Sequence, residues 1–136
     1  MIRTADMEIP VAGIATDAAH SVKNRLTGFR GVDLSGNREI FLCYIGNKTV
    51  NTGEFLGVIA AVKYILENDC TPVIYTDSTT AVTWYNNMKT ASKKTYAELG
   101  KAEVFLKIMS ERIKHIRVLH WDNNLWGEIP ADFGHK

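Results

Sequence analysis

The chain opens with three short runs of residues that are typical of β-strands. Ile9 to Thr16 is an apolar run rich in β-forming residues and alanine, and it predicts a buried strand that delivers Asp17 at its carboxyl end. Two more strands are predicted at Thr27 to Leu34 and Glu39 to Ile45. The segment between them, Ser35-Gly36-Asn37, has the composition of a hairpin turn. The pattern therefore predicts a three-stranded antiparallel meander.

A helical hydrophobic period replaces the strand pattern after the third strand. Asn51 or Thr52 is suited to cap this helix, and Glu54 then falls in its first turn. Glu54, Gly57 and Ala61 share one side through their three- and four-residue spacing, and small residues allow that side to approach the sheet. We therefore expect the Glu54 carboxylate to point towards the sheet. The apolar positions with helical spacing are Phe55, Val58, Ile59, Val62, Ile65 and Leu66.

The second half of the chain predicts alternating strands and helices. Pro72 to Thr76 is a second candidate for a buried strand, and it ends at Asp77-Ser78. The order strand, strand, strand, helix, strand, helix, helix, strand predicts an α/β fold. Its mixed five-stranded sheet would combine the antiparallel meander with two parallel strands, flanked by helices. The remaining expected elements are a helix over Thr79 to Asn87, an amphipathic helix marked by Leu99, Ala102, Leu106, Met109 and Ile113, a strand over Ile116 to Trp121, and a loop from Asp122 to Lys136.

Length and composition fit a single folded domain over residues 1–136, with a formal net charge of +1. Met1 to Pro10 looks like neither a signal peptide nor a membrane span, and no apolar run approaches about 18 residues. We therefore expect a cytoplasmic protein with no membrane association. Cys43 and Cys70 lie far apart in the sequence, and both are predicted to be small apolar core residues.

Acidic residues are the main candidates for chemistry. Ligands of mixed sheets gather beyond the carboxyl ends of the parallel strands, where Asp17 and Asp77 should meet. Taken singly, each acid could be a turn residue, and Glu54 could merely favour the helix dipole. Together, carboxylates without His or Cys suit Mg²⁺ or Mn²⁺, and two such ions can support phosphodiester cleavage.

Four segments around these acids resemble the ribonuclease H family of type 1, and the resemblance runs from Ala15 to Lys136. Their order and spacing are similar to the four acidic motifs of that family. The segments are Thr16-Asp17-Ala18-Ala19, Asn51-Thr52-Gly53-Glu54-Phe55-Leu56, Tyr75-Thr76-Asp77-Ser78 and Ala131-Asp132-Phe133-Gly134.

The resemblance implies a ribonuclease H-like fold and cleavage of the RNA strand of an RNA–DNA hybrid with two Mg²⁺ ions, for which Mn²⁺ can substitute. It implies that Asp17 bridges both ions, that Glu54 and Asp77 hold one of them, and that Asp132 helps to hold the other. We predict no obligate protein partner.

Two groups of residues outside the metal centre are candidates for contacts to the hybrid, the first through the resemblance and the second through charge and residue type. Thr49 matches a position that contacts a phosphate of the DNA strand, and Asn51 and Ser78 suit the reading of RNA hydroxyls. Lys89, Lys93 and Lys94 form a local basic patch that could bind nucleic acid or be an ordinary solvated surface. Beside this patch, Trp84 could stack on a sugar or base, or it could close the core between helix and sheet.

Two positions depart from the family pattern. The family often has a mobile histidine about ten residues before its last acid, where this chain has Asp122. Glu128 stands where the family commonly has Asn, so this loop could add a fifth carboxylate or point away from the site. Two alternatives to an active ribonuclease therefore stay open: a catalytically weakened module that binds hybrid or RNA, and a related nuclease of the same superfold that acts on DNA or junctions.

Overall fold

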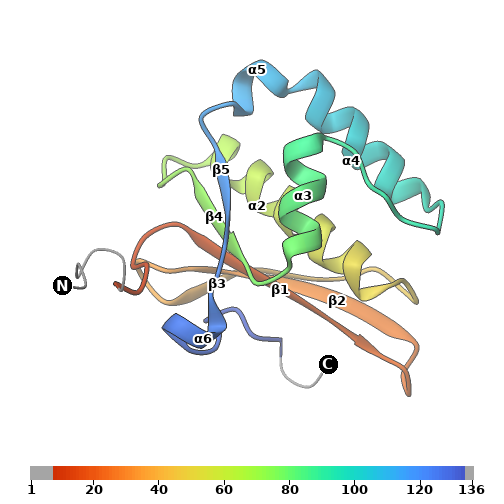
Figure 1. Cartoon of the computed structure of the whole chain (residues 1–136), viewed down its shortest axis with the longest axis horizontal. Helices are drawn as coiled ribbons and strands as arrows, with labels where there is room; N and C mark the ends of the chain where they lie inside the picture. Colours follow the sequence, from red (N-terminus) through yellow and green to blue (C-terminus); the bar gives the residue numbers. More distant parts are fainter. Residues whose placement is uncertain (1–7, 134–136) are drawn as a thin grey trace.

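The computed structural model describes residues 8–133, which form an α/β fold (Figure 1). The predicted order of strands and helices is confirmed, with a further short helix near the carboxyl end. The elements are β1 Ile14–Ser21, β2 Leu26–Asp33, β3 Arg38–Tyr44, α2 Val50–Glu67, β4 Val73–Thr76, α3 Thr79–Asn87, α4 Ala97–Ile108, α5 Ser110–Ile113, β5 Arg117–His120 and α6 Asn123–Trp126. The predictions for the first seven residues, and those for Gly134 and the tail, lie outside the described residues.

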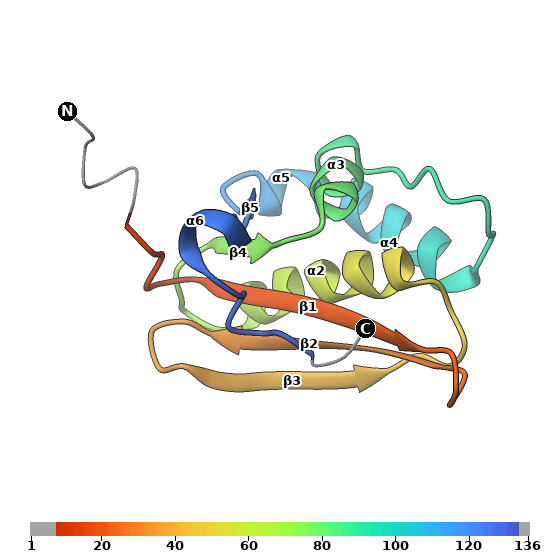
Figure 2. The same cartoon turned by 60° about the horizontal axis from the view of Figure 1, so that its bottom comes forward.

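The sheet is mixed, as the sequence predicts, with the strand order β3-β2-β1-β4-β5. The meander β1, β2 and β3 pairs antiparallel, whereas β4 pairs parallel with both β1 and β5. Figure 2 shows the meander strands side by side, with α2 behind them. The turn between β2 and β3 is the predicted one, and its Asn37 has the left-handed φ of 48° that Asn tolerates well.

The first strand differs from its prediction. It runs from Ile14 to Ser21 instead of from Ile9 to Thr16, so Asp17 lies inside the strand and not beyond its end. Local apolar content misplaced the strand because its length is set by its partner β2, which pairs with it as far as Ser21 opposite Leu26. Pairing across the sheet therefore overrides the local pattern here.

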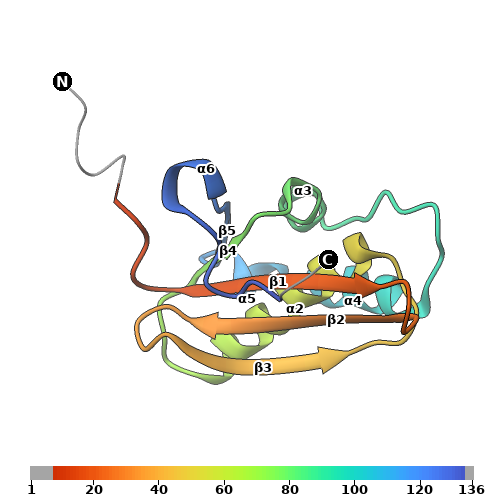
Figure 3. The ribbon, with the colours of Figure 1, turned by 90° about the horizontal axis from the view of Figure 1, so that it is seen from below.

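Helices α2 to α5 lie on one face of the sheet, and α6 with the following segment lies on the other (Figures 1 and 3). Each face has its own apolar core because successive residues of a strand point to opposite sides. Ile14 belongs to the large core under α2, whereas Ala15 belongs to a smaller core with Trp121 of the segment after β5. The other buried members of the smaller core are Val32, Ile129 and Ala131.

The start of α2 also differs from its prediction. Thr49 is the N-cap, and its hydroxyl accepts a hydrogen bond from the Thr52 amide at 3.2 Å. Asn51 and Thr52, the predicted caps, therefore lie within the first turn, and Glu54 lies in the second turn. Thr49, Asn51 and Thr52 are all residue types that commonly cap helices, so the local sequence did not distinguish them.

Two further predictions are wrong. The amphipathic run from Leu99 to Ile113 is not one helix, because Met109, with φ −90° and ψ 4°, separates α4 from α5. The cysteines are not both core residues: Cys43 is exposed on β3 and Cys70 is partly exposed. A cysteine on a strand is buried only if its face of the sheet is covered at that point, which the local sequence does not report.

No helix among residues 8–133 is long and apolar enough to cross a membrane.

Gly53 lies at a close approach of α2 to the sheet. A Cβ atom at this position would lie 2.9 Å from Cγ2 of Thr27 and 3.0 Å from Cβ of Ala18. Both distances are shorter than normal van der Waals contact, so a side chain here would push the helix away from β1 and β2.

We predict opposite effects for two glycine-to-alanine substitutions in helices. Gly53→Ala should lower the free energy of unfolding by about 1–3 kcal/mol because it overpacks the interface between α2 and the sheet. Gly100→Ala, in α4, has open space around the added methyl group and should raise it by about 0.5–1 kcal/mol. Urea denaturation measures both values, and equal stabilisation by the two substitutions would contradict the close approach at Gly53.

Candidate metal centre

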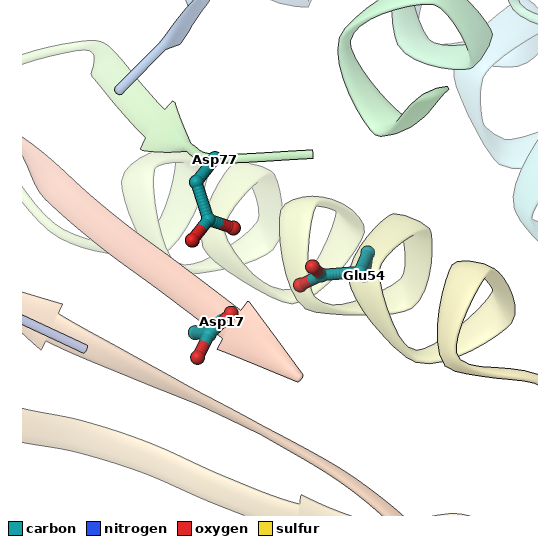
Figure 4. Close-up of side chains that lie close together, drawn as sticks. All are labelled: Asp17, Glu54 and Asp77. Atoms are coloured by element: carbon teal, nitrogen blue, oxygen red, sulfur yellow. The ribbon is translucent and has the colours of Figure 1, made fainter. Parts of the chain in front are cut away.

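Three carboxylates meet where β1 and β4 part, beside α2. Asp17, Glu54 and Asp77 each place one side-chain oxygen within 4.8 Å of the others, and Figure 4 shows the three side chains converging from β1, α2 and the end of β4. Asp17 is 1% exposed and Glu54 is 7% exposed, whereas Asp77 is partly open to solvent. The centre is therefore largely buried, with access on the Asp77 side.

The parallel pairing of β1 with β4 brings the two aspartates together. This pairing covers three residues of each strand and ends with Thr16 opposite Thr76. The next residue of each strand is an aspartate, so Asp17 and Asp77 stand beside each other where the two strands part. The predicted meeting of these acids is confirmed, although Asp17 is not at the end of its strand.

Helix α2 supplies the third acid because it packs tightly on the sheet. Glu54 is buried together with Gly53 and Gly57, and a Cβ at Gly57 would lie only 3.3 Å from the Cβ of Phe29. Small residues on both sides of the carboxylate therefore let the helix backbone approach the strands. The prediction that Glu54 points towards the sheet is confirmed.

Asp132 adjoins the centre through its backbone. The amide of Phe133, which follows Asp132, donates a hydrogen bond to Oδ2 of Asp17 at 2.9 Å. On the other side of the same peptide group, the carbonyl oxygen of Asp132 accepts a hydrogen bond from the Arg30 guanidinium at 3.0 Å. Asp132 does not belong to the group of oxygens within 4.8 Å, so its role as a metal ligand stays a prediction.

Asn123, after β5, contacts the centre and was missed by the sequence reasoning. The Asn123 side-chain amide donates a hydrogen bond to Oδ2 of Asp77 at 3.1 Å. Asp122 caps α6, since its Oδ1 accepts hydrogen bonds from the amides of Asn124 and Leu125, both at 3.0 Å. Asp122 is thus used as a helix cap, and no local signal in the sequence separates that role from a catalytic one. Glu128, the candidate fifth carboxylate, is exposed after α6.

The three predicted polar contacts to substrate lie at the starts of two helices. Thr49 caps α2, and Asn51 is exposed in the first turn of the same helix. Ser78 caps α3, and its hydroxyl accepts a hydrogen bond from the Ala81 amide at 3.0 Å. Ser78 directly follows Asp77, so the start of α3 adjoins the acidic centre.

Trp84 lies in the core. It is 6% exposed, and its ring meets that of Phe55 edge to face, with 5.7 Å between the ring centroids. The structure therefore corresponds to the alternative in which Trp84 closes the core between helix and sheet, and it contradicts stacking of this ring on a substrate. Whether Trp84 is buried depends on which face of α3 packs against the core, and the few apolar positions of this short helix did not predict that face.

The basic patch lies on the link between α3 and α4. Lys89, Lys93 and Lys94 are all exposed there. The amide and the hydroxyl of Thr90 donate hydrogen bonds to Oε2 of Glu103 in α4, at 2.8 and 2.7 Å. These bonds, above all the one from the Thr90 side chain, lower the pKa of Glu103. The ionised carboxylate thus ties the start of the lysine link to α4.

The donor set determines which ligand the acidic centre fits. Three converging carboxylates repel one another strongly in a buried site, and a divalent cation offsets that repulsion. Oxygen donors without nitrogen or sulfur suit a hard ion such as Mg²⁺ or Mn²⁺. Asp17, Glu54 and Asp77 therefore fit a divalent metal ion.

Solved structures with the same architecture include ribonucleases H. LC11-RNase H1, isolated from compost by a metagenomic approach, matches with a TM-score of 0.57 and 20% identity over 82% of this chain and 84% of that chain. The same enzyme in complex with an RNA/DNA hybrid gives a TM-score of 0.52 and 18% identity, with 82% and 85% covered. RNase H1 of the halophilic archaeon Halobacterium salinarum gives a TM-score of 0.52 and 17% identity, with 82% and 86% covered.

No protein-family model matches the sequence. At identities of 17–20%, the structural matches concern the backbone arrangement and not the chemistry. The mixed sheet with its antiparallel meander, its two parallel strands and its flanking helices is common to all of them. The chain has the ribonuclease H-like fold, resembling that of the type 1 enzymes.

Proposed function

We propose that this protein is a metal-dependent endoribonuclease that cleaves the RNA strand of RNA–DNA hybrids by two-metal-ion hydrolysis of the phosphodiester bond. The observation that carries the proposal is the convergence of Asp17, Glu54 and Asp77 within 4.8 Å in a ribonuclease H-like fold. A structural neighbour, LC11-RNase H1, has been solved with an RNA/DNA hybrid bound, which supports this class of substrate.

Each of the four acids would serve as a ligand to one or both ions. Asp17 is the central and most buried ligand and would serve both ions, with Glu54 and Asp77 completing one site and Asp132 contributing to the other. When bound, two divalent ions stabilise the attacking and the leaving oxygens on either side of the phosphorus. Asn123 holds the Asp77 carboxylate by a hydrogen bond and would orient it for this role.

The substrate would lie across the starts of α2 and α3. Thr49, Asn51 and Ser78 stand there, and helix N-termini attract phosphate through their unpaired amides and dipole. The exposed lysines of the link between α3 and α4 would add contacts to the phosphate backbone, which carry affinity without selecting a base sequence.

A weakened enzyme that mainly binds hybrid or RNA is the second candidate. The observation that favours it is that Asp122, at the position of the family's mobile histidine, is engaged as the cap of α6. A nuclease of the same superfold that acts on DNA or junctions is also compatible with the acids, because one fold serves several activities.

We predict that Asp17→Asn and Asp77→Asn each lower the cleavage rate by about 10³-fold, since each loses several kcal/mol of transition-state stabilisation. The same variants should lose the stabilisation by Mn²⁺, which for a protein with an intact site is about 2.7 kcal/mol at 100 times the Kd. Single-turnover cleavage and thermal unfolding with and without Mn²⁺ measure the two effects.

Asp69→Asn is the matched control, because Asp69 is an exposed acid beyond the far end of α2. It should keep both the cleavage rate and the stabilisation by Mn²⁺. Undiminished cleavage by purified Asp17→Asn protein would contradict the metal centre.

The substrate class is tested with end-labelled duplexes of one sequence. With Mg²⁺ or Mn²⁺, we expect the RNA strand of the hybrid to be cut, and duplex RNA and duplex DNA to stay intact. Cleavage of DNA without cleavage of RNA would overturn the substrate assignment. Tight hybrid binding without cleavage, together with no Mn²⁺ binding by calorimetry, would favour the binding module.

The basic link should matter for affinity more than for chemistry. Replacing both Lys93 and Lys94 by Gln removes two candidate phosphate contacts, so we expect KM to rise, kcat to change little and the salt dependence of binding to flatten by a slope of about 1.8. The control replaces two other exposed lysines by Gln: Lys107 in α4 and Lys114, which directly follows α5. It should leave the salt dependence of binding unchanged. If the two double variants showed the same salt dependence of binding, the link between α3 and α4 would not be part of the substrate-binding surface.

A further inference from the structure

The peptide group between Asp132 and Phe133 is held from both sides by two residues that face each other across β1 and β2. Its N–H donates to Oδ2 of Asp17 at 2.9 Å, and its carbonyl oxygen accepts from Nη1 of Arg30 at 3.0 Å. Asp17 and Arg30 are direct partners in the antiparallel pairing. The amide of Asp132 is also engaged, donating to the Ile129 carbonyl at 2.9 Å. The backbone of Asp132 is therefore fixed on both sides of its Cα atom.

We propose that Arg30 is a positioning residue that sets the place of Asp132 in the metal centre. The inference deepens the proposed function and rests on it. Asp132 comes from a segment that belongs to no helix or strand, so its side chain is placed by tertiary contacts alone. The bond from Arg30 fixes the carbonyl side of the peptide while Asp17 fixes the amide side. The same metal ligand thus helps to place the fourth acid.

The guanidinium of Arg30 is also paired by charge. Its Nε lies 2.9 Å from Oε1 of Glu39 on β3, an ion pair without hydrogen-bond geometry, and the Arg30 side chain is 27% exposed. Arginine presents several N–H groups in a fixed plane, so one group can pair with the Glu39 carboxylate and donate from Nη1 to the Asp132 carbonyl. A lysine has a single flexible ammonium group and would hold the two partners less well.

Charge supports the same role. Directly opposed residues of an antiparallel pair have Cβ atoms about 4.5–5.5 Å apart, so the Arg30 side chain leaves the sheet beside that of Asp17. Its positive charge lies next to a centre of converging carboxylates and offsets part of their repulsion when no metal is bound. If Arg30 served only to join β2 to β3, its ion pair with Glu39 would be sufficient, and its hydrogen bond to the Asp132 carbonyl would have no role.

The proposal is tested with Arg30→Met, Arg30→Lys and the control Arg38→Met, which removes an exposed arginine from β3. The first measurement is the hydrogen exchange of the Phe133 amide by NMR in metal-free protein. Loss of one hydrogen bond that holds this peptide should speed the exchange about fivefold or more in Arg30→Met. The second is calorimetric titration with Mn²⁺ alone, in which Arg30→Met should lower affinity about 10–100-fold. Arg30→Lys should give intermediate values and Arg38→Met should match the parent.

Three outcomes are distinguishable. Fast exchange of the Phe133 amide together with weakened Mn²⁺ binding in Arg30→Met, partly restored in Arg30→Lys, supports the positioning role. Unchanged exchange and unchanged Mn²⁺ affinity in a folded Arg30→Met protein overturn it and leave Arg30 as a link between strands. Neither measurement depends on cleavage, so a parent protein that cuts no hybrid overturns the proposed function without deciding this proposal.

Discussion

The acidic centre depends on where one strand changes its hydrogen-bonding partner. β1 pairs with β4 for only three residues but continues along β2 for its full length. Where the short parallel pairing stops, β1 and β4 part, and the next residues are Asp17 and Asp77. The remaining features of the centre are arranged around this point, because each of them must reach two carboxylates whose positions the sheet has already fixed.

Bringing a third carboxylate to this point requires a helix backbone to lie unusually close to the strands. Gly53 provides the approach, since a methyl group there would lie 2.9 Å from Thr27 Cγ2 and 3.0 Å from Ala18 Cβ, closer than van der Waals contact. The large core beneath α2 offsets the cost of gathering like charges in a buried place. The metal-free protein thus holds Asp17 and Glu54 in an arrangement that a divalent cation would stabilise.

The opposite face of the sheet contributes through the segment that follows β5. A small core around Trp121 anchors this segment, and the indole N–H of Trp121 donates to the Gly127 carbonyl at 2.9 Å. From there the chain returns to β1, where Asp17 binds the Phe133 amide. The fold therefore brings Phe133 to the carboxylate of Asp17, more than one hundred positions away in sequence. Arg30, the β2 partner of Asp17, donates to the carbonyl oxygen of the same peptide group.

The sequence by itself determined the order of the main strands and helices and singled out Asp17, Glu54 and Asp77 as candidate site residues. Hydrophobic period and residue type are local properties, and they are sufficient to predict a buried strand, an amphipathic helix and an acid beside each. The parallel meeting of Asp17 and Asp77 also followed, because strand direction is implied by the order of elements.

Only the tertiary structure decided the true extent of β1, the burial of Trp84, the exposure of Cys43 and the contacts of Arg30. Each of these depends on which surface of another element covers the residue, or on a hydrogen bond to a distant part of the chain. A local pattern carries no information about such partners, since the same residues would show the same period whether or not a distant segment packs against them.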